Sequence, residues 1–370
     1  MSNTPSPVDL AFMEEALDLA AKGKGWTSPN PCVGALVVQA GRVVGRGYHP
    51  RAGSAHAEAT ALRRAGPRAE GAALYVTLEP CSHFGRTPPC VDRVLESGVS
   101  RVVVAMADPN PRVRGRGLRK LRRAGRQVVT GVCRERAQRL NEDFTKFITT
   151  GRPFVTLKLA LSLDGKIATR TGDSKWITSP FARARAHQLR HEHDAIMVGR
   201  GTVAQDDPRL TTRLPGNRQG KHPARVVVDA RAQTPVAAQA LASADAPRFL
   251  VCGSAAPASR VCRLQRAGVQ VLTVATTARG LDLHEALALL AQRGVTSVLI
   301  EGGSRLATSA LEAGVVDKVA FFYAPKIIGG TESLTAIGGE GVTVVADALQ
   351  LRHAMVERLG TDFLVVGYLP

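Results

Sequence analysis

Four side chains in the N-terminal quarter of the chain constrain its fold more than any other feature. His56 is followed by Glu58, and two cysteines come later, Cys81 and Cys90, each directly after a proline. An imidazole and two thiolates can hold a zinc ion with a fourth position open to water, while an unligated carboxylate moves protons. The fold must therefore bring these four residues together. The pattern is typical of a zinc site that removes an amino group from a base by hydrolysis.

The predicted secondary structure indicates how such a site is assembled. His56 and Cys90 each lie in the first turn of a predicted helix, where free N–H groups and the positive end of the helix dipole favour a thiolate. Cys81 follows a predicted strand over residues 73–77. Glu58 cannot share a helix face with His56 and is left to act on the water. Further predicted elements are a helix over 8–22, a hairpin over 35–44, a strand over 101–105, a basic helix within 107–126 and a helical connector over 134–150.

The spacing of the two cysteines indicates which class of substrate the site accepts. Deaminases that act on nucleic acids carry the form P-C-x-x-C, whereas eight residues separate Cys81 from Cys90. Those eight include three donors suited to a phosphate ester, namely His83, Arg86 and Thr87. Two alternatives remain: a solvated loop arginine at 86, and a closed structural zinc site with His83 as fourth ligand. Since a closed site leaves the nearby carboxylate without a task, we favour hydrolysis of a small phosphorylated substrate.

The second half of the chain predicts a separate α/β domain. A chain of 370 residues is long enough for two buried cores. Gly151-Arg152-Pro153 forms a natural boundary, which predicts domains over residues 1–150 and 151–370. Predicted strands over 155–160, 195–198, 225–228 and 298–300 alternate with helical segments, including one over 180–193. Gly302 and Gly303 follow the last strand and offer backbone N–H groups to a diphosphate. No G-x-G-x-x-G follows a strand, so a Rossmann fold is not supported.

Charge and composition bear on partners and compartment. The net charge of +18 points toward nucleic acid, but aromatic residues are only 4% of the chain, which leaves few stacking platforms. Two rival functions therefore stay open, an RNA-modifying deaminase and a non-catalytic zinc-stabilised binding module. The chain shows no run of about 18 apolar residues, no secretory signal and six dispersed cysteines. We expect a cytoplasmic protein that contacts no membrane.

A series of motifs across both halves resembles one enzyme family. They are HAE, TLEPCSHFGRTPPC, KLALSLDGKIA, SKWITS, VGRGTVAQDDPRLTTR, EGGSRLATSAL and PKIIGG. Together they resemble the bifunctional deaminase/reductase family of riboflavin biosynthesis from about residue 8 to residue 368. The resemblance implies an N-terminal cytidine-deaminase-like three-layer α/β/α domain and a C-terminal dihydrofolate-reductase-like α/β domain. It implies zinc-dependent deamination of a diaminopyrimidinone carrying a ribosylamino 5′-phosphate, then NADPH-dependent reduction of the ribosyl group to ribityl.

The resemblance also assigns roles in the deaminase half. It implies that His56, Cys81 and Cys90 bind one zinc ion and that Glu58 is the proton shuttle. It implies that five residues contact the substrate: Asn30, His49, His83, Arg86 and Thr87. For Asn30, whose amide offers both a donor and an acceptor, capping of a turn before Pro31 is the alternative.

The reductase half receives a longer set of implied roles. The expected NADPH contacts are Ala160, Trp176, Thr202, Asp206, Gly303, Ser304, Arg305, Leu306, Ala307, Thr308 and Ser309. The expected substrate contacts are Ser174, Arg190, Leu210, Arg213 and Glu301. Lys158 is a possible catalytic residue that protonates the sugar oxygen on ring opening, or else a strand lysine paired with a carboxylate. Ala230 departs from the serine common in the family, which puts one cofactor contact in doubt. The expected partners are the phosphorylated pyrimidine and further copies of the chain, without nucleic acid or membrane.

Overall fold

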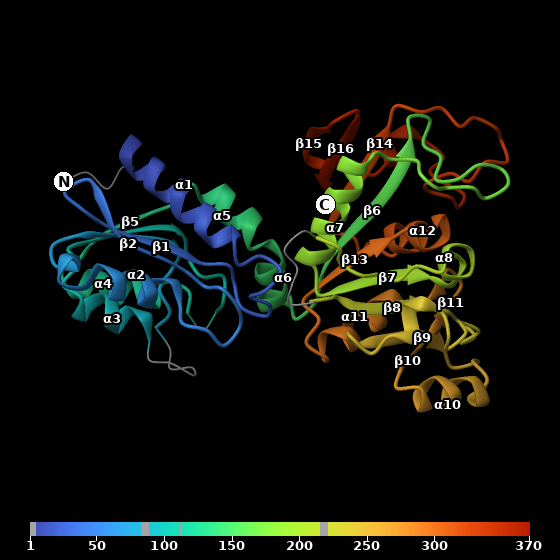
Figure 1. Cartoon of the computed structure of the whole chain (residues 1–370), viewed down its shortest axis with the longest axis horizontal. Coiled ribbons are helices and arrows are strands. Elements are labelled where there is room, and N and C mark those ends of the chain that lie inside the picture. Colours follow the sequence, from blue (N-terminus) through green and yellow to red (C-terminus); the bar gives the residue numbers. More distant parts are fainter. Residues whose placement is uncertain (1–4, 83–88, 112, 215–220) are drawn as a thin grey trace. The chain divides into compact units, whose positions relative to one another are not determined.

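Two structural units follow one another along the chain, Met1–Gly151 and Arg152–Pro370. The computed structural model describes residues 5–82, 89–111, 113–214 and 221–370. Each unit has its own sheet and its own buried core, so each is described by itself (Figure 1).

The N-terminal unit is built on a five-stranded sheet with the order β2-β1-β3-β4-β5. The predicted hairpin is present, because β1 pairs antiparallel with β2. β1 is also antiparallel to β3, whereas β3, β4 and β5 run parallel. The strands are β1 (Gly34–Gln39), β2 (Arg42–Tyr48), β3 (Ala73–Leu78), β4 (Arg101–Met106) and β5 (Gln127–Thr130).

Helices cover both faces of this sheet and make three layers (Figure 1). On one face Leu36 and Val103 pack with α1 (Pro7–Ala21) and α5 (Arg134–Leu140). On the other, Val37 and Val102 pack with α2 (Ala57–Ala65), α3 (Cys90–Glu96) and α4 (Arg116–Arg123). Neighbouring strand residues point to opposite faces, so one apolar run feeds both cores. A 3-10 turn, Gly66–Ala69, follows α2, and α6 (Glu142–Thr150) ends the unit.

A buried carboxylate fastens α1 to the sheet. The Asp9 side chain completes a capping box with Ser6 at the start of α1. The same carboxylate receives two hydrogen bonds from the Arg101 guanidinium, at 2.6 and 2.9 Å, and one from the Tyr75 hydroxyl at 2.9 Å. The Arg101 partner holds the pKa of Asp9 far below its usual range. The helix start and strands β3 and β4 are thus joined by one ionic group.

The helical connector predicted over 134–150 is present, but it is interrupted. The structure has two helices, α5 and α6, separated at Asn141. The Asn141 backbone leaves helical geometry, and its side chain bonds to the main chain of Cys32 instead. This long-range contact ends the first helix, and helical periodicity alone does not show it.

The C-terminal unit is built on a nine-stranded sheet with the order β10-β9-β8-β7-β13-β6-β14-β16-β15. The strands from β10 to β14 in this order run parallel, and β16 and β15 continue the sheet as antiparallel strands. Their bounds are β6 (Phe154–Ser162), β7 (Ala195–Gly199), β8 (Ala224–Val228), β9 (Arg248–Gly253), β10 (Gln270–Val274), β13 (Ser297–Glu301), β14 (Lys318–Ala324), β15 (Arg352–Leu359) and β16 (Asp362–Tyr368). A separate small ribbon joins β11 (Thr276–Thr277) to β12 (Gly280–Leu281).

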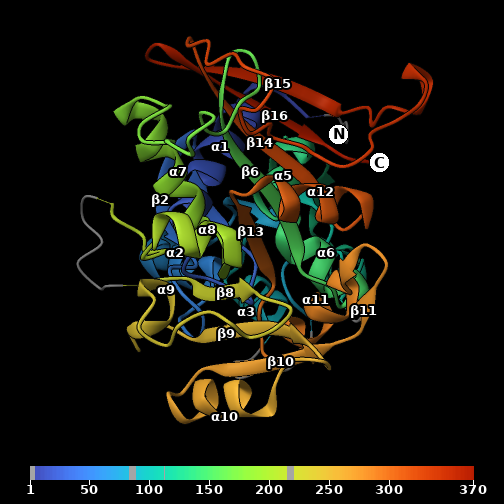
Figure 2. The ribbon, with the colours of Figure 1, turned by 90° about the vertical axis from the view of Figure 1, so that its right-hand side faces the viewer.

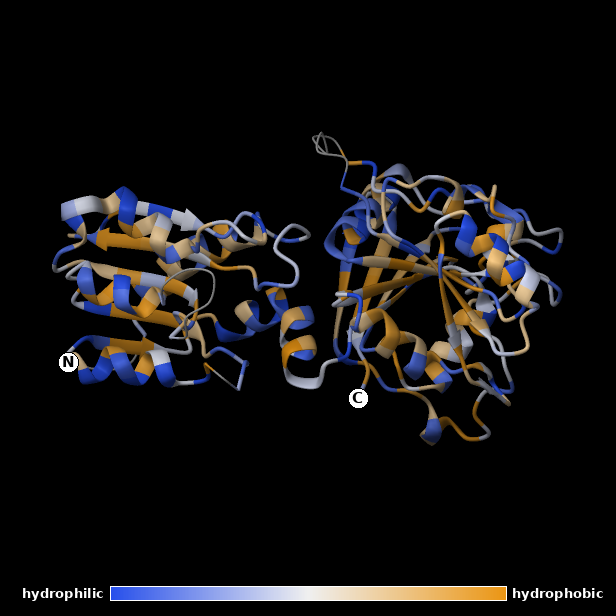
Figure 3. Ribbon diagram, turned by 90° about the horizontal axis from the view of Figure 1, so that it is seen from below, coloured by the Kyte–Doolittle hydropathy of each residue, from blue (hydrophilic) through white to orange (hydrophobic). Residues whose placement is uncertain are grey.

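Helices cover both faces of the second sheet as well (Figure 2). α11 (Leu283–Ala291) and α12 (Ser304–Glu312) pack on one face, with Leu157 and Leu159 of β6. The opposite face carries α7 (Pro180–Glu192), α8 (Arg200–Asp206), α9 (Gln239–Ala242) and α10 (Ala258–Arg266). A 3-10 turn, Val345–Asp347, precedes β15. Figure 3 shows hydrophobic strands inside each unit and hydrophilic outer faces on the helices. Within the described ranges, no helix is long and apolar enough to cross a membrane.

Candidate active sites

The three predicted zinc ligands meet at one place in the N-terminal unit. His56 is the N-cap of α2, Cys90 is the first residue of α3, and Cys81 follows β3. Their ligand atoms all lie within 4.8 Å of one another. His56 Nδ1 is 3.1 Å from Cys90 Sγ and 3.7 Å from Cys81 Sγ. Zinc bonds of about 2.0 to 2.3 Å place tetrahedral neighbours roughly 3.3 to 3.8 Å apart. The separation of His56 from Cys81 lies in that range and its separation from Cys90 is slightly shorter, so this donor set fits zinc in chemistry and needs only a small adjustment in spacing.

Cys81 and Glu58 have pKa values shifted toward the forms that the predicted chemistry needs, whereas the hydrogen bond with Cys81 and burial raise the pKa of the Cys90 thiol. Hydrogen bonds from Cys90, its backbone N–H included, and from His56 stabilise the Cys81 thiolate and lower its pKa. Glu58 lies in the first turn of α2 and is only 4% exposed. Burial raises the pKa of Glu58 to about 7. A carboxyl group with such a pKa can both accept and donate a proton near neutral pH.

Glu79 is a site residue that the sequence reasoning missed. It lies two residues before Cys81 and is only 2% exposed. Four backbone N–H groups donate to its carboxylate at 2.9 to 3.3 Å, those of Asp108, Gly115, Gly117 and Leu118. The last two belong to the first turn of α4, where a negative charge is stabilised by the helix dipole. The strand end that carries Cys81 is therefore fixed to α4. Its only sequence signal is its place directly before Pro80-Cys81.

Two of the predicted substrate contacts lie beside the metal ligands. Asn30 Nδ2 is 3.2 Å from His49 Nε2. The His49 ring meets the His56 ring edge-on, with 5.6 Å between centroids. Asn30 is thus connected to His56 through His49, and the role of both residues as substrate contacts stays a prediction. His83, Arg86 and Thr87 lie outside the described residues, so the predicted phosphate contacts of this unit stay predictions.

A second cluster of charged side chains forms on the α7 face of the C-terminal sheet. Lys158 of β6 and Glu301 of β13 are register partners in adjacent parallel strands. Arg190 of α7 donates two hydrogen bonds to the Glu301 carboxylate, at 2.7 and 2.6 Å. Although burial opposes ionisation, the charge and hydrogen bonds of Arg190 lower the pKa of Glu301 to about 2. Burial lowers the pKa of Lys158. Both predictions for Lys158, a proton donor or the partner of a carboxylate, remain open.

The structure adds His187 to this cluster. His187 lies one turn before Arg190 on α7, and its Nδ1 accepts a hydrogen bond from the Arg213 backbone N–H at 3.4 Å. Burial and the charges of Arg190 and Arg213 lower the pKa of His187 to about 4, so the ring is neutral at pH 7. With Nδ1 accepting, the proton of the neutral ring lies on Nε2. A histidine within a helical run gave no sequence signal for this role.

The remaining predicted substrate residues are placed differently. Leu210 is buried and packs in the apolar cluster that includes Val203, so only its backbone is available to a ligand. The Arg213 side chain is exposed, and it donates to the Thr211 hydroxyl at 3.1 Å. Ser174 lies between β6 and α7, two residues before Trp176, and is partly exposed.

Several predicted cofactor residues gather near the start of α12. Gly302 and Gly303 both have positive φ, and Gly303 is the N-cap of the helix. A Cβ on Gly303 would lie 3.0 Å from the Thr202 hydroxyl of α8, so the loop needs glycine to pack there. Asp206, at the end of α8, pairs with Lys175 at 3.4 Å. This loop of free N–H groups beside a hydroxyl is suited to a diphosphate.

The other predicted cofactor contacts divide into exposed and buried groups. Trp176 is 62% exposed and lies against Arg183, whose guanidinium carbon is 4.6 Å from the ring centroid. Within α12, the side chains of Ser304, Arg305 and Ser309 reach the surface, whereas Leu306, Ala307 and Thr308 are buried. Ala160 lies on β6 and Ala230 follows β8 on the surface. Of the three buried residues, Leu306 lies in the first turn, where its N–H can face a cofactor, whereas the Ala307 N–H already donates to the Gly303 carbonyl oxygen at 3.1 Å.

Comparison with known proteins assigns both units. Residues 6–106 match the family model of the cytidine and deoxycytidylate deaminase zinc-binding region. Residues 153–365 match the RibD C-terminal domain. The chain is 47% identical over 358 residues to the riboflavin biosynthesis protein RibD of Aquifex aeolicus, covering 97% of this chain and 98% of that protein. The chain belongs to the RibD family.

Other RibD proteins are similar to this chain in sequence and in structure. The RibD of Escherichia coli K12 is 39% identical over 364 residues, covering 96% of this chain and 97% of that protein. The solved Acinetobacter baumannii RibD covers 98% of this chain and 99% of its own, with 36% identity and a TM-score of 0.87. The diaminohydroxyphosphoribosylaminopyrimidine deaminase/5-amino-6-(5-phosphoribosylamino)uracil reductase of Thermotoga maritima has the same coverage, with 37% identity and a TM-score of 0.85.

RibD membership confirms the predicted fold class and the bifunctional nature of the chain. The N-terminal unit is a cytidine-deaminase-like domain, and the C-terminal unit is a dihydrofolate-reductase-like domain. The chain is a deaminase and reductase of riboflavin biosynthesis, which decides against an RNA-modifying deaminase and against a non-catalytic binding module. The two domain matches imply a zinc ion for the first unit and a nicotinamide cofactor for the second.

Proposed function

We propose that the N-terminal unit deaminates a diaminopyrimidinone that carries a ribosylamino 5′-phosphate. His56, Cys81 and Cys90 would hold zinc, and their convergence within 4.8 Å is the observation that carries the proposal. Zinc at this place would supply Lewis acidity that lowers the pKa of a water molecule. The similar Thermotoga maritima protein is, by its name, a deaminase of a diaminohydroxyphosphoribosylaminopyrimidine, which supports the same substrate class here.

The other residues of this unit have separate tasks. Glu58 takes a proton from the attacking water and delivers it to the leaving amino nitrogen, for which its pKa of about 7 is suited. Asn30 and His49 orient the pyrimidine, since they lie in contact beside His56. We assign the ribosyl phosphate to His83, Arg86 and Thr87 on their donor chemistry alone.

In the C-terminal unit we propose reduction of the ribosyl group to ribityl with NADPH as the cofactor. NADPH would supply the hydride for C1′ of the sugar. The N–H groups at the start of α12, those of Gly303, Ser304, Arg305 and Leu306, bind its diphosphate, since the Ala307 N–H already donates to the Gly303 carbonyl oxygen. Ala307, Thr308 and Ser309 lie behind this turn, and Ala160, Trp176, Thr202 and Asp206 complete the contacts. The choice of NADPH over NADH rests on the resemblance of the motifs to the bifunctional deaminase/reductase family.

The substrate of the reductase is held by the charged cluster. Arg213 takes the 5′-phosphate, while the backbone at Leu210 and the side chain of Ser174 contact the rest of the substrate. Glu301 is ionised and held by Arg190, so it accepts hydrogen bonds from the sugar hydroxyls. Lys158 is register partner to Glu301 and has a lowered pKa, which supports its proposed role as proton donor to the sugar oxygen.

The assembled protein is proposed to be a cytoplasmic homo-oligomer. All six cysteines are free thiols, as a reducing compartment allows. β15 is an edge strand of the sheet, and its Val356 is 69% exposed, which leaves an apolar edge for a second copy. Light scattering on the purified protein tests this, and a monomer at micromolar concentration would contradict it.

A single variant tests the assignment of the deaminase. Glu58→Gln removes the group that carries the proton and leaves all three metal ligands in place. We expect zinc content to stay at one ion per chain while ammonia release falls by about 10²- to 10⁴-fold. Reduction of supplied deaminated substrate should be unchanged. Deamination at the wild-type rate in this variant would remove Glu58 from the mechanism.

A further inference from the structure

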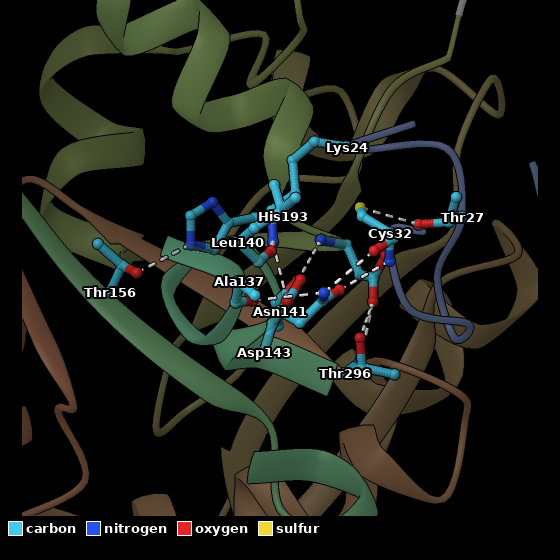
Figure 4. A network of polar contacts seen from close by, with 12 residues as sticks. Lys24, Thr27, Cys32, Ala137, Leu140, Asn141, Asp143, Thr156, His193 and Thr296 are labelled. Atoms are coloured by element: carbon cyan, nitrogen blue, oxygen red, sulfur yellow. Dashed lines mark hydrogen bonds and ion pairs between the residues drawn. The ribbon is translucent and has the colours of Figure 1, made fainter. Parts of the chain in front are cut away.

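Asn141, between α5 and α6, makes a specific contact far away in the sequence (Figure 4). Its side chain is 1% exposed. Oδ1 accepts from the Cys32 backbone N–H at 2.7 Å, and Nδ2 donates to the Cys32 carbonyl oxygen at 3.0 Å. One amide thus satisfies both backbone groups of a residue 109 positions earlier in the chain. A carboxylate or an apolar side chain of similar size cannot do this, because it lacks either the donor or both groups.

Cys32 belongs to the loop that carries Asn30. Within this loop the Asn30 N–H donates to the Thr27 carbonyl oxygen at 2.7 Å, and the Thr27 hydroxyl is 3.4 Å from Cys32 Sγ. The next contacts lead to the metal ligands. Asn30 Nδ2 is 3.2 Å from His49 Nε2, and the His49 ring lies against that of His56.

The loop has little regular structure of its own to hold it. The segment between α1 and β1 consists of turns and extended residues, and the chain after β2 reaches it through two backbone hydrogen bonds, from the His49 N–H to the Val33 carbonyl oxygen at 2.9 Å and from the Ala52 N–H to the Trp26 carbonyl oxygen at 3.3 Å. Ordering such a segment costs about 1 to 2 kcal/mol per residue in backbone entropy. Contacts from elsewhere must therefore offset this cost, and the Asn141 amide binds the loop only two residues from Asn30.

We propose that Asn141 is a positioning residue of the deaminase, which sets the place of Asn30 against the pyrimidine through the backbone of Cys32. The inference rests on the proposed role of Asn30 as a pyrimidine contact. Asn141 acts only through this loop and touches neither metal nor substrate. Its loss weakens binding of the pyrimidine more than it slows the chemical step, because Glu58 and the three ligands are held by other elements.

Steady-state kinetics of deamination on Asn141→Ala, in the full-length zinc-loaded enzyme, test this. We expect KM for the diaminopyrimidinone ribosyl phosphate to rise about five- to tenfold, the equivalent of one or two lost hydrogen bonds, with kcat changed less than about twofold. Zinc content and the rate of reduction of supplied deaminated substrate should stay at wild-type values. A merely structural residue would instead lower the active fraction and hence kcat.

A matched control separates the hydrogen bond from general loosening of the helix junction. Lys24 fastens the same junction through other atoms, since it donates to the Leu140 carbonyl oxygen at 3.0 Å and pairs with Asp143 at 2.8 Å (Figure 4). Lys24 belongs to the same segment as Asn30 but stands six residues before it, whereas Cys32 stands two residues after it. Lys24→Met should therefore destabilise the junction yet raise KM clearly less than Asn141→Ala does. A rise in KM equal to that of Asn141→Ala would overturn the inference.

A double-mutant cycle with Asn30→Ala shows whether Asn141 acts through Asn30. In the Asn30→Ala background, Asn141→Ala should raise KM by less than about twofold. Full additivity of the two effects overturns the inference while leaving the role of Asn30 intact. If Asn30→Ala alone leaves KM unchanged, the proposed role of Asn30 is wrong and the inference with it. Should Asn141→Ala be insoluble, Asn141→Asp, which keeps the acceptor and lacks the donor, is read by the same criteria.

Discussion

Replacement of Glu79 by glutamine should destabilise the deaminase unit strongly, although Glu79 touches neither metal nor substrate. The carboxylate accepts four backbone N–H bonds, two on each oxygen. Glutamine retains one oxygen and turns an NH₂ group toward the other two donors. Two buried N–H groups then lack an acceptor, at a cost of about 1 to 3 kcal/mol each, and the charge that favours the other two is lost. The expected loss is roughly 2 to 6 kcal/mol in the free energy of unfolding.

Calorimetry on the full-length zinc-loaded enzyme measures this effect. The chain has two units, so two transitions are expected and only the one of the deaminase unit should move. For a unit of this size the shift corresponds to a fall of roughly 4 to 24 °C in Tm. Zinc affinity should fall with it, because the strand end that carries Cys81 loses its attachment to α4. Reduction of supplied deaminated substrate reports that the other unit is intact.

The control for this prediction is Glu96→Gln, since Glu96 is an exposed glutamate at the end of α3 in the same unit. That substitution should change Tm by less than about 1 °C, as is usual for surface positions. The reasoning is refuted if Glu79→Gln melts like the control. In that case the four hydrogen bonds would contribute no net stability.

Three further predictions concern the reductase unit. Arg213→Ala should raise KM for the phosphorylated substrate about tenfold or more, and an unchanged KM would take Arg213 out of the site. His187→Asn, whose Oδ1 can replace the Nδ1 acceptor, should raise this KM less than His187→Ala does. The pKa of Glu301, held at about 2, contributes stability that is fully present above the unfolded value and is lost as pH falls from about 4.3 toward 2. The Tm of the C-terminal unit should therefore fall over this range, and Glu301→Gln should flatten that slope; equal slopes would show that Glu301 is not the group responsible.

The zinc ligands and the general fold were accessible to sequence reasoning for a physical reason. Each zinc ligand lies next to the end of a helix or strand that the local sequence pattern predicts, namely His56, Cys81 and Cys90. The ends of such elements on one side of a parallel sheet converge. The alternation of short strands with helices was equally local. Motif order along the chain then supplied the family, which the comparisons confirm.

The residues that the sequence did not reveal are those whose partners are far away in the chain. Glu79 precedes a metal ligand, but its four donors lie 29 to 39 residues later. Asn141 ends a helix only because Cys32 is there to receive its side chain. The place of His187 in the site follows only from the structure, in which α7 carries it near Arg190, the partner of Glu301 on β13. Periodicity reports which face of an element is buried, and it carries no information on which distant polar group completes a hydrogen bond.

The central claim, two successive reactions on one chain, is tested most directly by one assay of the purified protein. Ammonia release and NADPH oxidation are followed together on the diaminopyrimidinone ribosyl phosphate, with and without a zinc chelator. The account predicts both signals without chelator, neither with it, and continued NADPH oxidation in the presence of chelator when deaminated substrate is supplied. Absence of both signals from zinc-loaded protein would contradict the proposed substrate, and deamination that survives complete removal of zinc would contradict the proposed metal site.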